Sequence, residues 1–258
     1  MISIISIYRK DVIGTAMASR MGEWGVQINP VLKPGPAGGE RHAQSRETVV
    51  VGIDVGGLRK GFHAVALREG SYLNKFASPD ARDLAAWCIQ VGARAVAVDA
   101  PCRWSRTGRA RPAERAPAAE GIHAFATPSL EAAEGHAFYR WMHNGAALYD
   151  VIEPHYPLFD GGHAVSGPVC CETFPQAVAC ALAGKVVSAR RKTTVRRELL
   201  REAGLATKPL SNIDLVDAAL CALAAQALLA GRFQTYGDAR EGFIVVPAWA
   251  KLPAAGAN

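Results

Sequence analysis

The chain has 258 residues, of which half are hydrophobic and 20% are charged. This composition excludes disorder along the whole length, because disordered chains are poor in apolar residues and rich in charge. No run of about 18 apolar residues occurs, which excludes a membrane-spanning helix. The net charge of +6 permits a polyanionic partner without requiring one. Six cysteines without a Cys-x-x-Cys pair predict buried thiols in a reducing, cytoplasmic compartment.

The first 46 residues differ from the rest of the chain. They contain several prolines, a glycine-rich stretch at 35–39 and no sustained hydrophobic periodicity. This pattern predicts a mobile N-terminal extension. Met17 and Met21 are alternative start sites, and the folded domain is expected to span 47–250.

A strongly β-branched run at 48–55 predicts a buried strand that ends in the Gly56-Gly57 turn. Strands at 61–67 and 72–77 follow after short connections, which predicts an antiparallel meander. A helix from Pro79 to Val91 precedes a fourth strand at 94–100. A helical crossover of this kind brings the fourth strand parallel to an earlier one.

The second half of the chain alternates helices with strands. Residues 103–128 are irregular and arginine-rich, and the further elements expected are a helix at 129–143, a strand at 168–173, helices at 175–182, 185–203 and 211–229, and a strand at 243–246. The predicted fold is an α/β domain in which a mixed sheet, made of a three-stranded antiparallel meander plus parallel strands, is flanked by helices. A helical insertion is expected at about 103–168.

Two aspartates lie near the C-terminal ends of predicted strands. Asp54 shares its strand face with Gly52 and Gly56, and Asp99 shares its face with small alanines. Ligands of open α/β sheets bind beyond these strand ends, and a carboxylate within an apolar strand is costly unless it is paired or binds a metal. The alternative is a carboxylate that accepts backbone N–H groups.

Three further acids are candidates for the same site. Asp214 and Asp217 are three residues apart and therefore share one face of the 211–229 helix. For Asp214 the alternative is a capping box with Ser211. Glu172 ends the fifth strand, and its alternative role is to complement the dipole of the following helix.

Clustered carboxylates repel one another, and a divalent cation relieves that repulsion. We therefore expect Asp54, Asp99 and Asp217 to hold Mg²⁺ or Mn²⁺, with Asp214 and Glu172 assisting catalysis. The scattered histidines and cysteines offer no competing zinc site, and His63 is interpreted as a half-buried structural histidine.

Two basic groups flank the expected cleft and suit the phosphates of a nucleic acid. The first follows the Asp99 strand and the second precedes the Asp214 helix; the residues are Arg103, Arg106 and Arg115, then Arg190, Arg191, Lys192, Arg196 and Arg197. For the second group, the alternative is a solvated helix face.

The chain resembles RNase H-like domains, and more closely a bacterial and archaeal family of predicted RNase H-like nucleases, domain of unknown function 429. The resemblance covers about 50–247 and rests on Gly52-Ile53-Asp54, Val98-Asp99-Ala100-Pro101, Phe125-Ala126-Thr127-Pro128, Glu172-Thr173-Phe174-Pro175-Gln176 and Ile213-Asp214-x-x-Asp217-Ala218. It implies a nuclease or phosphodiesterase in which a metal-activated water hydrolyses nucleic-acid phosphodiester bonds. The alternatives are a non-catalytic nucleic-acid-binding or scaffold protein, and an actin- or sugar-kinase-like phosphotransferase.

Overall fold

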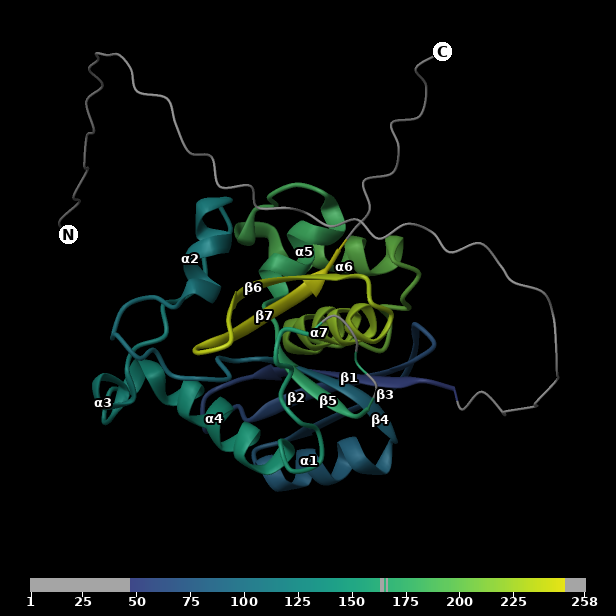
Figure 1. Cartoon of the computed structure of the whole chain (residues 1–258). Helices are drawn as coiled ribbons and strands as arrows, with labels where there is room; N and C mark the ends of the chain where they lie inside the picture. Colours follow the sequence, from purple (N-terminus) through teal and green to yellow (C-terminus); the bar gives the residue numbers. More distant parts are fainter. Residues whose placement is uncertain (1–46, 163–164, 166, 249–258) are drawn as a thin grey trace, which may run out of the picture. The chain divides into compact units, whose positions relative to one another are not determined.

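A computed structural model describes residues 47–162, 165 and 167–248. The predicted extension at 1–46 lies outside these residues. The described part folds around one seven-stranded sheet (Figure 1). Its strands are β1 (Val49–Val55), β2 (Phe62–Arg68), β3 (Ser71–Ser78), β4 (Ala93–Asp99), β5 (Val169–Glu172), β6 (Phe233–Asp238) and β7 (Gly242–Pro247).

The order of strands across the sheet is β3-β2-β1-β4-β5-β7-β6. The first three strands pair antiparallel, as the short turns between them require, and β4 and β5 extend the sheet in parallel to β1. The helix α1 (Ala81–Gln90) provides the crossover between β3 and β4. The predicted mixed sheet, a three-stranded antiparallel meander extended by parallel strands, is therefore confirmed.

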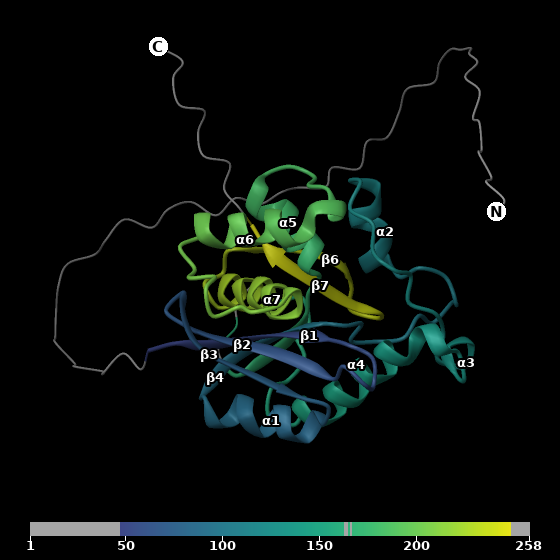
Figure 2. The ribbon, with the colours of Figure 1, turned by 180° about the vertical axis from the view of Figure 1, so that it is seen from behind.

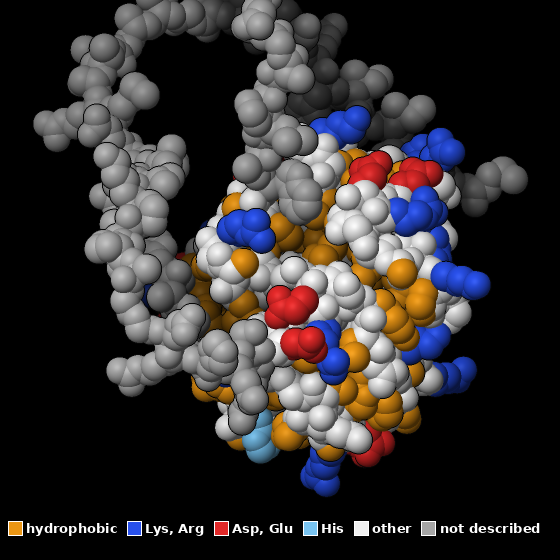
Figure 3. Space-filling model, turned by 90° about the vertical axis from the view of Figure 1, so that its right-hand side faces the viewer, with side chains coloured by type: hydrophobic (Ala, Val, Ile, Leu, Met, Phe, Trp, Pro, Cys, Tyr) orange, Lys and Arg blue, Asp and Glu red, His pale blue; other side chains and the backbone are white. Residues whose placement is uncertain are grey.

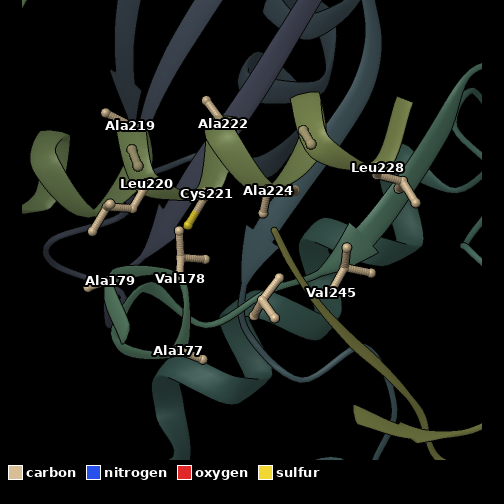
Figure 4. Packing of buried hydrophobic residues seen from close by; sticks show 14 of the residues in the cluster. Ala177, Val178, Ala179, Ala219, Leu220, Cys221, Ala222, Ala224, Leu228 and Val245 are labelled. Atoms are coloured by element: carbon tan, nitrogen blue, oxygen red, sulfur yellow. The ribbon is translucent and has the colours of Figure 1, made fainter. Parts of the chain in front are cut away.

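Helices cover both faces of the sheet (Figures 1 and 2). The side chains of Val51 and Ile53 belong to one core cluster with α1 and α4 (Arg140–Ile152). The opposite face carries α7 (Ile213–Leu229), with α5 (Pro175–Ala183) and α6 (Lys192–Glu202) further out. Figure 4 shows side chains of α7 packed beside α5 and β7. Since α7 is covered on several sides, its first turn is held firmly against the sheet.

Gly52 explains why small residues surround the strand aspartates. A Cβ at Gly52 would overlap the backbone oxygen of Ala218 and the backbone nitrogen of Ala222 in α7. The glycine therefore lets the backbones of β1 and α7 approach each other directly. This close contact places Asp54, two residues further along β1, beside the N-terminal turn of α7.

The helices of the insertion differ from the prediction. The helix expected at 129–143 is wrong, because the chain turns at Gly135, which has a φ of 70°. Instead, a single turn α3 (Leu130–Ala133) is followed by α4, which continues to Ile152. An additional helix α2 (Pro112–Ala119) occupies the stretch expected to be irregular, with Pro112 at its first position.

Two other features complete the fold. The strand β6 was not predicted, and it forms the edge of the sheet as the antiparallel partner of β7. All six cysteines are free and buried, as predicted. Within the described residues, no helix combines the length and the apolar character needed to cross a membrane.

Candidate functional site

The strand register places three polar side chains in a row across the sheet. Asp54 of β1 is the direct partner of Asp99 in the parallel strand β4 and of His63 in the antiparallel strand β2. Directly paired residues point to the same face of a sheet, and neighbouring strands are about 4.8 Å apart. His63, Asp54 and Asp99 therefore lie side by side on the face that α7 covers.

The helix α7 brings two more carboxylates to this row. Its N-cap is Asn212, whose Oδ1 accepts a hydrogen bond from the Leu215 N–H at 2.9 Å. The alternative of a capping box between Ser211 and Asp214 is therefore wrong, since the helix begins one residue later than that pattern requires. Asp214 is free of a capping role, and its Oδ1 accepts a hydrogen bond from the Lys60 Nζ at 2.5 Å.

These acids line a cavity of about 440 Å³ at the ends of the strands. Asp54, Asp99, Asp214 and Asp217 all face it, together with Lys60 and Lys192, the β1–β2 turn, and Phe125 and Trp141 from the insertion. The four aspartates come from distant parts of the sequence, and the structure brings them together in this one cavity.

Two of the four aspartates already have cationic partners. Asp217 is buried and is bound by the guanidinium of Arg196, which is also buried and donates a further hydrogen bond to Gln176 at 2.9 Å. The Lys192 ammonium lies 3.6 Å from the second oxygen of Asp217. Asp217 therefore lies between two cationic side chains of α6, in which Arg196 and Lys192 are one turn apart.

Asp54 and Asp99 have a different environment. Within the described part of the chain, neither side chain accepts a hydrogen bond or forms an ion pair. Burial, together with the charges of Asp217 and Asp214, raises the pKa of Asp54 from 3.8 to about 7. Burial and the charge of Asp54 raise the pKa of Asp99 well above its ordinary value. The charges of Lys60 and Lys192 offset part of this shift at Asp54, and that of Arg196 part of the shift at Asp99, but neither carboxylate has a direct ion-pair partner among the described residues.

Glu172 lines the same cavity as the four aspartates. It pairs with Val98 of β4 and with Ile244 of β7, and its charge contributes to the raised pKa of Asp99. Its two oxygens accept hydrogen bonds from Arg111 at 3.0 and 2.6 Å, and the Cys102 N–H donates another at 2.8 Å. Arg111 is 1% exposed. This buried pair joins the insertion to β5.

The donor set beside α7 fits a divalent cation. In the described ranges, one group of three ligating side chains has all its donor atoms within 4.8 Å of one another, namely Asp54, His63 and Asp214. The Nδ1 atom of His63 is buried and has no hydrogen-bond partner. Asp99 and Asp217, which were expected among the ligands, are not part of that group. His63 was interpreted as structural, and its pairing with Asp54 across the hairpin is the signal that identifies it.

The predicted phosphate-binding residues are in two environments. Arg196 is buried against Asp217, and Arg197 donates hydrogen bonds to the backbone oxygens of Thr207 and Leu210. Arg103 pairs with Glu153 at 2.7 Å. Arg103 is exposed, as are the other members of the two groups: Arg106, Arg115, Arg190, Arg191 and Lys192. Of these, Arg115 also donates a hydrogen bond to the backbone oxygen of Ala110 at 2.6 Å. On the face shown in Figure 3, lysine and arginine side chains are interspersed with acidic and hydrophobic ones.

Strand order and the carboxylates at the strand ends define an α/β protein with an acidic cavity. The chain belongs to the family described as "Protein of unknown function (DUF429)", whose model matches residues 52–241. A solved structure titled "Thermus thermophilus RuvC structure" is 19% identical, with a TM-score of 0.36, and the match covers 71% of this chain and 96% of that chain. No curated protein matches the chain.

Proposed function

We propose that the protein is a divalent-metal-dependent phosphodiesterase that hydrolyses nucleic-acid phosphodiester bonds. The observation that supports this most directly is the pair Asp54 and Asp99. Two neighbouring carboxylates without cationic partners, facing a cavity, are costly for the fold. Groups with strongly perturbed pKa values in a cavity are typical of functional sites.

A bound divalent ion would supply Lewis-acid activation of water and neutralise charge on the phosphate. Asp54 would be its central ligand, because it lies between His63 and Asp99 in the row and beside Asp214. Asp99, the neighbour of Asp54 on β4, would help to neutralise the ion's charge. Asp217 is the fourth aspartate that lines the cavity, and Arg196 orients its carboxylate. Lys192, whose side chain is 46% exposed, reaches the same cavity and would contact a substrate phosphate.

Nucleic acid is the substrate class that the surroundings favour. The exposed members of the two basic groups would neutralise backbone phosphates on either side of the scissile bond: Arg106, Arg115, Arg190 and Arg191. We place the substrate across the cavity mouth, with the insertion at 103–168 on one side and α6 on the other. The Arg103 and Arg196 side chains are left out of this role because they pair with acidic residues of the protein, and Arg197 because its guanidinium bonds two backbone oxygens.

The test is cleavage of labelled single- and double-stranded DNA and RNA with Mg²⁺ or Mn²⁺. We expect Asp54→Asn to reduce cleavage at least about a hundredfold, because losing a ligand costs at least as much as losing a residue that orients one. Substrate binding should persist. Asp150→Asn is the matched control, since Asp150 is exposed on α4. Cleavage that Asp54→Asn leaves unchanged would contradict the proposal.

One observation favours a second function, in which the domain binds nucleic acid without chemistry. Asp214 and Asp217 are already neutralised by Lys60 and Arg196, as expected of a site that needs no metal. That protein would bind DNA or RNA equally well with and without divalent ions. The same experiment separates the two functions, because binding without any metal-dependent cleavage supports the second.

A further inference from the structure

We propose that His63 supplies a nitrogen ligand to the ion and makes the site selective for a first-row transition metal such as Mn²⁺ over Mg²⁺. This inference rests on the proposed function for the presence of an ion, and adds the ion's identity and a further ligand.

The first argument is position. His63 is the register partner of Asp54, and its ring lies on the α7 face of the β1–β2 hairpin. A ring nitrogen of His63 and carboxylate oxygens of Asp54 and Asp214 all lie within 4.8 Å of one another. Two strands and one helix therefore direct three donors to one point. The hairpin and the helix start are both fixed by backbone hydrogen bonds, so the donors are placed before an ion arrives.

The second argument is the unsatisfied imidazole. The Nδ1 atom of His63 is buried and lacks a hydrogen-bond partner among the residues that the structure describes. Buried polar atoms nearly always have such a partner, and each exception needs an explanation. A structural histidine would satisfy its nitrogens with the protein. His63 thus has one ring nitrogen near the carboxylates of Asp54 and Asp214 and an Nδ1 atom without a partner in the described protein, and a neutral imidazole can bind a metal through either nitrogen.

The third argument is the cation now beside Asp214. The Lys60 ammonium bonds one oxygen of that carboxylate at 2.5 Å, while the lysine side chain is 51% exposed. A long exposed side chain withdraws into solvent at low cost, because surface ion pairs contribute little to stability. Lys60 therefore marks a position where positive charge is favourable, and it can yield that position to an ion.

The chemistry of the donor atoms determines which divalent ion the site prefers. Mg²⁺ is a hard ion that binds oxygen and keeps much of its water, whereas imidazole nitrogen suits transition-metal ions. A site made of carboxylates alone would accept both. Adding one imidazole leaves Mg²⁺ binding almost unchanged and strengthens the binding of Mn²⁺.

The test is pulsed electron paramagnetic resonance of Mn²⁺ bound to the full chain without a histidine tag. We expect modulation from a directly coordinated imidazole nitrogen in the wild type, its loss in His63→Ala, and its retention in His155→Ala, an exposed histidine after α4. Bound Mn²⁺ without nitrogen coupling in the wild type, or no bound Mn²⁺, overturns the inference. The wild-type spectrum decides even if a variant folds poorly.

A titration gives the second measurement. In His63→Ala the affinity for Mn²⁺ should fall at least about tenfold, while the affinity for Mg²⁺, measured by competition, changes little. Equal losses for the two ions would contradict the inference. Nitrogen coupling without hydrolysis of any phosphodiester would refute the proposed function and leave the role of His63 intact. Hydrolysis without nitrogen coupling would support the proposed function and refute the role of His63.

Discussion

Removing the charge of Asp54 should stabilise the protein when no divalent ion is present. The pKa of this carboxyl is raised from 3.8 to about 7 by burial and by neighbouring aspartates. A shift of one unit corresponds to about 1.4 kcal/mol, so ionising Asp54 in the folded state costs up to about 4 kcal/mol. An asparagine avoids that cost but buries an amide that needs partners, at about 1–2 kcal/mol. Asp54→Asn should therefore gain about 2 kcal/mol.

The free energy of unfolding should depend on pH for the same reason. Because the folded state binds the proton of Asp54 more tightly than the unfolded state does, wild-type stability falls as the pH rises from about 4 to about 7. The advantage of Asp54→Asn should grow over this window and then level off. Urea unfolding in EDTA at several pH values measures it, with Asp150→Asn as the control. A variant that is less stable than the wild type at pH 8 would refute the reasoning.

Two further predictions concern the framework of the site. Gly52→Ala should destabilise the fold by about 3 kcal/mol, because the added Cβ overlaps the backbone of α7. The control in urea unfolding is Gly57→Ala, whose added Cβ meets open space. Equal losses of stability in the two variants would contradict this prediction. Arg111→Met should cost about 3–5 kcal/mol by leaving buried carboxylates unpaired. Adding Glu172→Gln should recover part of that loss, and a double-mutant cycle without coupling would show that the pair does not act together.

Much of the fold follows from local patterns. The β-branched run before Gly56 and the alternation along β4 predicted which residues face each side of the sheet, and the two core clusters agree with that assignment. The break at Gly135 was missed because helical periodicity continues on both sides of it. β6 was missed because its residues are mostly only half-buried, and its place at the sheet edge depends on pairing with β7.

The sequence was enough to predict which acidic residues form the site, but not which cationic residues pair with them. Strand ends and helix spacing identified the four aspartates, since those positions follow from sequence periodicity. Ion pairs depend on where α6 and the insertion dock, so the sequence did not reveal that Arg196 binds Asp217 or that Arg111 binds Glu172. Glu172 lines the same cavity as the aspartates, as its place at the end of β5 suggested, but its pairing with Arg111 depends on where the insertion docks.

The four aspartates lie far apart along the chain, and this has a consequence for synthesis on the ribosome. β1 and β4 emerge early, whereas α7 follows more than one hundred residues after β4. A growing chain that lacks α7 exposes the small-residue face of β1 and has half of the acids. Any activity that needs all four aspartates can therefore begin only after α7 has left the ribosome.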